Sequence, residues 1–155
     1  MAVNHLPFIG NVETMKDEML SVEDDLYQSA ITFIKERYPT GWGGAAAIRL
    51  RSGDILTSVA PDTDFDALAA CMELGAILEA HKLDEAVTHS ICVFRDGEHS
   101  RFKILSPCGI CQERLRHWGS DVMVAISNPE QKVMFKPLLA LQPHHWRTAI
   151  DQSNT

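Results

Sequence analysis

Apolar residues in the first part of the chain recur every three or four positions, which is the spacing of one helix face. The residues that share this face are Leu26, Ala30, Phe33, Ile34 and Tyr38. The pattern predicts a helix over Val22–Tyr38. Ser21, three residues before Asp24, gives a weak capping signal at its start, and Pro39 and Gly41 end it.

Shorter apolar runs rich in β-branched residues predict strands. The first two, residues 45–50 and 55–59, flank the turn-forming residues 51–54, so we expect an antiparallel hairpin. Further strands are expected over 87–94, 122–126 and 132–135, and a short run at 102–105 follows the polar residues 95–101. The run 122–126 is almost continuously apolar, which is typical of a strand covered on both faces.

Two more helices are expected between these strands. One begins just after Asp64 and Asp66, carries Cys71 and runs to about His81. Its expected packed face consists of Leu68, Ala76, Ile77 and Ala80. The other runs from Cys108 to about Trp118, with Ser106 as N-cap and Pro107 as first helical residue. Strands that alternate with helices predict an α/β domain whose sheet lies between helices.

Length and composition favour one domain. The chain has 155 residues, of which 45% are hydrophobic, enough for one core. We expect an N-terminal arm over 1–20, a domain over 21–150 and a tail over 151–155. No secretory leader or membrane-spanning apolar run is recognisable, so a cytoplasmic protein is expected. The net charge of −7 argues against a nucleic-acid partner.

The cysteines indicate a metal site. Cys108 and Cys111 are three residues apart and would share one face of a helix, while Cys71 would arrive from the other helix. Three protein ligands leave a tetrahedral zinc ion one open position for water, as in catalytic sites. Glu73, which need not bind the metal, could then move protons. Helix N-termini would also lower the pKa of the thiols.

Other interpretations of these residues stay open. Cys108 and Cys111 alone would also suit a structural zinc site or a redox pair. A structural zinc ion would need a fourth ligand, but Cys92 lies in an apolar strand and is expected to be a small buried hydrophobic residue. His5, His99 and His117 lie among polar residues and are expected at the surface.

The segment Ser106-Pro107-Cys108-Gly109-Ile110-Cys111, with Cys71-x-Glu73 upstream, resembles the motif of the cytidine deaminase family. The resemblance extends over about residues 42–146. It implies a three-layer α/β/α fold with a five-stranded mixed sheet, one zinc ion per chain on the three cysteines, and Glu73 as proton shuttle. It also implies a homotetramer, with a dimer as the less favoured assembly, whose active sites are completed by neighbouring copies.

The resemblance also suggests substrate contacts. Trp42 is aligned with an aromatic residue near the base, and Trp42, Asp62, Ser106 and Trp146 are the expected substrate-binding residues. Ala60-Pro61-Asp62 replaces the family's Asn-x-Glu for the ribose hydroxyls, and Ala60 cannot form such a bond. Trp42 would equally suit the core, and Asp62 a turn without further function.

Two other features are similar to the blasticidin S deaminase branch. Leu74 stands where many family members have an arginine that offsets the thiolate charge, and the tail contains His144-His145-Trp146. In that branch an aromatic C-terminal segment closes over the pocket. His144 and His145 would either line the pocket or pack a terminal segment against a neighbour.

The expected activity is hydrolytic deamination of a cytosine nucleoside to the uracil form with release of ammonia. Cytidine, deoxycytidine and an antibiotic such as blasticidin S all suit the site. Two alternatives remain: a nucleic-acid editing or binding protein on the same fold, and a structural zinc domain without activity. The acidic charge counts against the first, and a zinc-bound water would exclude the second.

Overall fold

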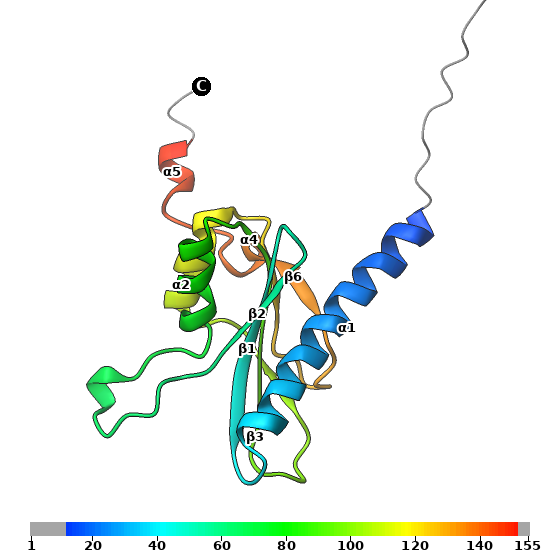
Figure 1. Ribbon diagram of the computed structural model, residues 1–155. Coiled ribbons are helices and arrows are strands. Elements are labelled where there is room, and N and C mark those ends of the chain that lie inside the picture. Colours follow the sequence, from blue (N-terminus) through cyan, green and yellow to red (C-terminus); the bar gives the residue numbers. More distant parts are fainter. Residues whose placement is uncertain (1–11, 152–155) are drawn as a thin grey trace, which may run out of the picture.

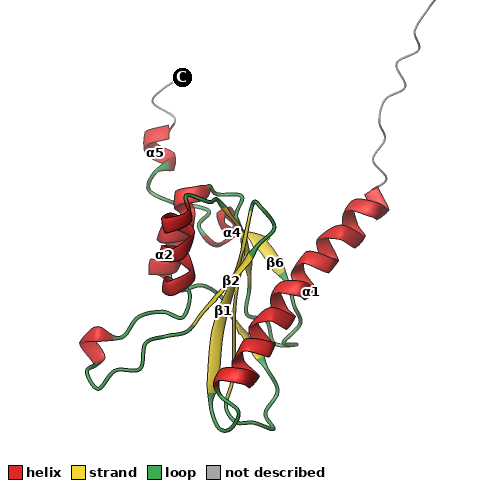
Figure 2. Ribbon diagram, in the orientation of Figure 1, coloured by secondary structure: helices red, strands yellow, loops and turns green. Residues whose placement is uncertain are grey.

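The computed structural model describes residues 12–151, and side chains from Val22 to Ile150. Residues 1–11 of the expected arm, with His5, and residues 152–155 of the expected tail lie outside this range. Within it the chain forms helices on both sides of a sheet (Figures 1 and 2).

The long helix α1, Val12–Arg37, begins ten residues before the expected start at Val22 and ends one residue before Tyr38. Neither proline nor glycine interrupts residues 12–37, and residues 12–21 consist largely of Glu, Met, Lys, Leu and other residues compatible with a helix. The weak signal at Ser21 therefore does not mark a helix start.

In residues 12–151 the strands form one mixed six-stranded sheet. The strands are β1 Gly43–Leu50, β2 Ile55–Ser58, β3 Val87–Arg95, β4 Lys103–Leu105, β5 Met123–Ala125 and β6 Phe135–Pro137. Their order is β2-β1-β3-β5-β6, with only β3 and β5 parallel. The hairpin of β1 and β2 is confirmed, and the last strand begins three residues later and ends two residues later than expected.

The sixth strand has a simple geometric origin. The full length of β3 pairs with β1 along one edge. On its other edge, residues 92–94 pair with β4 and residues 89–90 pair with β5. The short strands β4 and β5 thus lie one after the other along the same edge of β3. The sheet is therefore five strands wide, as predicted, although it contains six strands.

Helices cover both faces of the sheet, which confirms the three-layer α/β/α architecture. On one face, Leu26, Ala30 and Ile34 of α1 are fully buried against Ala45 and Ala47 of β1. On the other face lie α2 (Leu74–Leu83) and α3 (Gly109–Leu115), on the opposite side from α1 in Figure 1. Burial of each large side chain contributes about 1.5–3 kcal/mol.

The second core lies under α2 and α3. Ile48 and Leu50 of β1 point to it, because alternate strand residues face opposite sides. Ala76, Ile77 and Ala80 of α2 are buried there, as expected. Four short helical segments complete the described chain: 3₁₀ turns at Asp66–Leu68 and Arg116–Trp118, and α4 and α5 at Leu138–Leu141 and Thr148–Asp151.

The prediction for the start of α2 is wrong. A helix was expected from just after Asp66 through Cys71, but Ala69 adopts an extended conformation that ends the short 3₁₀ turn, and α2 begins only at Leu74. Leu68, which was expected in the packed face, is instead 64% exposed on the long loop between β2 and α2. Figure 2 shows this loop extending away from the sheet.

No helix in the part of the chain that the structure describes is long and apolar enough to cross a membrane.

His89 on β3 makes stability depend on pH. Burial, and secondarily the charge of Arg49, holds the pKa of His89 below its ordinary value of 6.5. Below pH 6.5 the unfolded chain binds a proton that the folded chain still excludes, so the free energy of unfolding falls as pH drops toward the folded-state pKa. We expect His89→Gln to reduce this loss between pH 7.5 and 5, measured by urea unfolding.

The matched control is His99→Gln, because His99 is exposed on the loop after β3. It should leave the pH dependence unchanged. Equal losses of stability in the native chain and in His89→Gln would contradict the prediction.

Candidate metal centre and active site

Three thiols converge on the face of the sheet that carries α2 and α3. The Sγ atoms of Cys71, Cys108 and Cys111 all lie within 4.8 Å of one another, and those of Cys71 and Cys108 are 3.1 Å apart. In the described part of the chain this is the only group of three or more Cys, His, Asp or Glu with metal-binding geometry. The expected ligand set is therefore assembled in the structure.

The donor set fits zinc. Zinc binds thiolate sulfur at about 2.3 Å, so two sulfurs on a tetrahedral ion lie about 3.8 Å apart. The observed separation of 3.1 Å between Cys71 and Cys108 is shorter than this, and all three sulfurs lie within 4.8 Å of one another, close enough to share one ion. No fourth ligand joins the group among the described residues, so a tetrahedral ion held there would keep one position open for water.

The sheet aligns the two segments that carry the thiols. Register pairs Ser58 of β2 with Ala46 of β1, Ala46 with Cys92 of β3, and Cys92 with Leu105 of β4. These four residues form one row across the sheet. The loop to Cys71 leaves β2 directly after Ser58, and the segment to Cys108 leaves β4 directly after Leu105. The row therefore fixes both entry points of the site.

Hydrogen bonds hold each segment in place. The Ser58 hydroxyl donates to the carbonyl of Met72 at 2.5 Å, which anchors the loop between Cys71 and Glu73. The Ser106 amide donates to the Ser127 hydroxyl at 2.9 Å, and the Ser127 amide donates to the Ser106 hydroxyl at 2.9 Å. The second pair ties the approach to Cys108 to the loop after β5.

Glu73 is buried beside the thiols without belonging to the ligand group. It is 4% exposed and occupies the N-cap position of α2. Burial raises its pKa, while its own backbone amide, the Cys111 thiol and the charge of Arg114 pull in the opposite direction. A carboxyl group in this position can exchange protons with a molecule bound at the thiol cluster.

The pKa shifts of the thiols correct the expectation that helix N-termini lower them. The pKa of Cys71 is raised, first by its hydrogen bond with Cys108 and then by burial. Burial and the charge of Glu73 raise the pKa of Cys111. Burial raises the pKa of Cys108, but hydrogen bonds with backbone amides and neighbouring thiols lower it by more, so the net pKa is lowered.

The helix starts explain this difference. The N-cap of α3 is Cys108, not Ser106 as expected, so its sulfur is close to free backbone amides. Cys71 lies three residues before α2 and has no such amides. Only one of the three thiols gains from a helix start, and a cation is needed to hold all of them as thiolates.

Arg114 is a site residue that sequence reasoning missed. The family resemblance places a compensating arginine after Glu73, where this chain has Leu74. In the structure the charge of Arg114 acts on Glu73 instead. Its spacing of three from Cys111, which puts both on one side of α3, is the signal that could have revealed it.

Two of the expected substrate contacts adjoin the metal loop or its approach. Trp42 is 50% exposed, so it is not a core residue, and its ring meets Tyr38 edge-on with centroids 6.0 Å apart. Ser106 precedes the cysteine pair and is bonded to Ser127. Asp62 lies on the exposed loop before the site, where its carboxylate pairs with Arg37 at 3.4 Å.

Trp146 belongs to a different region of the chain. It is 63% exposed and lines an open hollow of about 500 Å³ with Glu113, Leu141, Gln142, Pro143, His144 and His145, without any of the three cysteines. The structure therefore does not bring Trp146 into the thiol cluster of its own chain.

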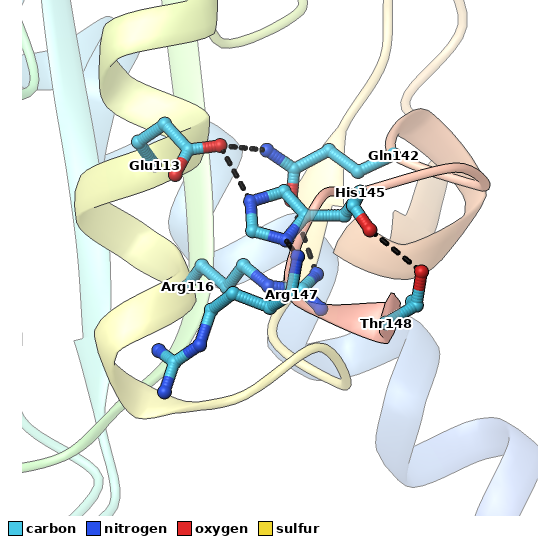
Figure 3. A network of polar contacts seen from close by, with 6 residues as sticks. All are labelled: Glu113, Arg116, Gln142, His145, Arg147 and Thr148. Atoms are coloured by element: carbon cyan, nitrogen blue, oxygen red, sulfur yellow. Dashed lines mark hydrogen bonds and ion pairs between the residues drawn. The ribbon is translucent and has the colours of Figure 1, made fainter. Parts of the chain in front are cut away.

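His145 packs the C-terminal segment onto α3 (Figure 3). Its side chain is 4% exposed, and Nε2 lies 2.8 Å from the Glu113 carboxylate. The amide of Arg147 donates to Nδ1 at 3.2 Å, so Nε2 carries the proton that the carboxylate accepts. Gln142 adds a second bond to Glu113 and accepts one from Arg116. His145 thus packs the terminal segment against α3 of its own chain, whereas the expected packing against a neighbouring copy stays a prediction.

The expectations for Cys92, His99 and His117 are confirmed, while His5 lies outside the described residues. Cys92 is 4% exposed within β3, and burial raises its pKa strongly. His99 and His117 are exposed, and His117 lies against His81 with ring centroids 4.7 Å apart.

Comparison with solved structures identifies the fold. The cytidine deaminase from Bacillus anthracis is 55% identical, with a TM-score of 0.83 over 85% of this chain and 94% of that chain. The cytidine deaminases from Mycobacterium leprae and Burkholderia pseudomallei share 20% and 18% identity, each with a TM-score of 0.60 over 78% of this chain, and 97% and 96% of their own lengths. The sequence matches no protein-family model and no curated protein.

Fold and thiol cluster together define a mixed α/β hydrolase with the architecture of the cytidine deaminases. At 55% identity over nearly the whole of a solved relative, the chain belongs to the cytidine deaminase family.

The metal site can be tested by removing one sulfur. We expect Cys71→Ser to reduce bound zinc from about one ion per chain to almost none, because two thiolates alone form an incomplete tetrahedral site. Bound metal is measured by elemental analysis after dialysis. Cys92→Ala, which removes the buried cysteine of β3, is the control and should keep its zinc. Full zinc content in Cys71→Ser would contradict the assignment.

Proposed function

We propose that this protein is a zinc-dependent hydrolytic deaminase that replaces the 4-amino group of a cytosine nucleoside by oxygen and releases ammonia. The observation that carries the proposal is the open three-thiol cluster with the buried, non-ligating Glu73 beside it. The 55% identical relative, which is a cytidine deaminase, supports cytidine as the first substrate to test.

Cys71, Cys108 and Cys111 would hold the zinc ion. When bound there, zinc lowers the pKa of a coordinated water toward neutrality and so supplies a nucleophile. The structure supports this role, because three soft sulfur donors lie within 4.8 Å of one another and no fourth protein ligand of the described residues closes the site.

Glu73 performs the proton transfers. It accepts a proton from the attacking water and delivers it to N3 of the ring. It then takes the second proton of that water, from the hydroxyl group now on C4, and delivers it to the departing amino group, which leaves as ammonia. Burial raises the pKa of Glu73, which brings the carboxyl closer to the range in which it can both bind and release protons.

Trp42, Asp62, Ser106 and Trp146 remain the proposed substrate contacts. Half-exposed Trp42 offers a flat apolar surface for the base. The Asp62 carboxylate can accept a hydrogen bond from a sugar hydroxyl, in exchange for its weak, exposed pair with Arg37. Ala60 offers no such bond, so we propose a sugar preference that differs from that of enzymes with Asn-x-Glu.

We also propose a homo-oligomer, a tetramer before a dimer. Cys108 is exposed, and Phe65 and Leu68 project 69% and 64% exposed from the loop before the site. A neighbouring copy would cover these residues, and the C-terminal segment with Trp146 could then close over a neighbour's site. The tail and Leu74 are similar to the blasticidin S deaminase branch, so we propose that antibiotic as a further candidate substrate.

The proton-shuttle role is tested by Glu73→Gln. We expect the variant to keep its zinc but to lose at least about 10²–10⁴-fold in kcat, since general acid–base catalysis contributes that much. The measurement is ammonia release from cytidine, together with bound zinc. Glu79→Gln, on the exposed side of the same helix, is the matched control and should behave as the native enzyme. A fully active Glu73→Gln variant would refute the mechanism.

The substrate is identified with a panel scored by ammonia release: cytidine, deoxycytidine, cytosine, blasticidin S, adenosine and guanine. We expect cytosine nucleosides to react and purines not to react. Absence of ammonia from every cytosine compound, with zinc bound, would overturn the proposed function.

A further inference from the structure

Gly44 of β1 marks a point where two side chains crowd together. A Cβ atom on Gly44 would lie 2.6 Å from the Sδ atom of Met72 and 3.1 Å from the nearest ring carbon of Trp42. Cβ atoms essentially never come within 3.0 Å of a heavy atom of a distant residue, so a side chain at Gly44 would displace the Met72 thioether. The thioether of Met72 and the indole of Trp42 therefore lie side by side over the same Cα atom.

This contact is on the side of the sheet that carries the thiols. Gly44 precedes Ala46, Ile48 and Leu50 at alternate positions, and Ile48 and Leu50 pack under α2. Met72 itself lies between the ligand Cys71 and the acid Glu73. Its side chain therefore leaves the middle of the catalytic loop and ends against Trp42.

Both residues have anchored backbones. The carbonyl of Met72 accepts the bond from Ser58, as described above. The loop that presents Trp42 is held at two points. The Gly41 amide donates to the Glu98 carboxylate at 2.8 Å, and Arg95 donates to the carbonyl of Tyr38 at 2.5 Å. The two side chains are thus carried by segments that are fixed relative to the sheet.

On the basis of the proposed function, we propose that Met72 and Trp42 form one apolar wall of the substrate pocket, and that Met72 limits the size of the group admitted beside the pyrimidine ring. Indole and thioether surfaces suit the face and edge of a planar heteroaromatic ring. The unbranched Met72 side chain lies next to the reacting centre by virtue of its position in the chain, so its length sets the width of the pocket there.

The test compares Met72→Ala with Met72→Leu. Removal of the thioether leaves a gap beside the ring. We expect Met72→Ala to raise KM for cytidine by about tenfold with a smaller change in kcat, since a missing group in an apolar pocket changes specificity by about 10–200-fold. For Met72→Ala we also expect a change in specificity. The ratio of kcat/KM for 5-alkyl or N4-alkyl cytidines to kcat/KM for cytidine should rise by a similar factor. Met72→Leu, which keeps the volume, should retain native ratios.

A second variant tests the packing without altering the wall residues. Gly44→Ala introduces a methyl group where Met72 and Trp42 meet, so it should displace them and raise KM while zinc stays bound. With Trp118→Phe and Trp146→Phe as background, Trp42 is the sole tryptophan, and both Gly44→Ala and Met72→Ala should shift its emission. Met134→Ala, in the loop before β6, is the control for methionine loss and should have native kinetics.

The outcomes separate the two proposals. Suppose that the native enzyme deaminates cytidine, and that Met72→Ala and Gly44→Ala both keep native KM values, substrate ratios and Trp42 emission. This result would overturn the proposed wall and leave the proposed function intact. A native enzyme that deaminates no cytosine compound would overturn the proposed function, and the wall as a substrate site with it.

Discussion

The structure depends on holding four acidic groups together in a small, partly buried space. Cys108 and Glu73 oppose the ionisation of Cys71, while burial, Glu73 and the two other thiols oppose that of Cys111. Burial also raises the pKa of Glu73. Without a cation, Cys71, Cys111 and Glu73 hold their protons more tightly than the same groups in water. A divalent ion can replace those protons, and its binding free energy then also joins the two segments that carry the sulfurs.

The sheet makes this arrangement possible through register. The row from Ser58 through Ala46 and Cys92 to Leu105 sets the two segments at one level of the sheet, although they are far apart in the sequence. Small side chains on these strands also help to accommodate the site. Ala46 and Cys92 leave room above the sheet, and Gly44, one pair further along β1, admits Met72 and Trp42.

Sequence reasoning could predict those features that depend on local pattern. The buried face of α1, the hairpin of β1 and β2, and the ligand set follow from periodicity, turn residues and cysteine spacing. The helix starts could not be predicted in this way, because they depend on tertiary geometry. The helical turn at Asp66–Leu68 ends at the extended Ala69, and α2 begins only at Leu74, so that Cys71 lies in a loop whose sulfur meets those of Cys108 and Cys111. This tertiary contact overrides the helix-favouring residues around Leu68.

The charge balance of the site shows how a change at one position alters the role of another element. Leu74 stands where the family resemblance implies an arginine, and the charge of Arg114 on α3, which also carries Cys111, acts on Glu73. The ligand and the compensating charge therefore move together. Through Glu113 the same helix is bonded to His145 and the C-terminal segment. A displacement of that segment would thus act on the helix that carries both Cys111 and Arg114.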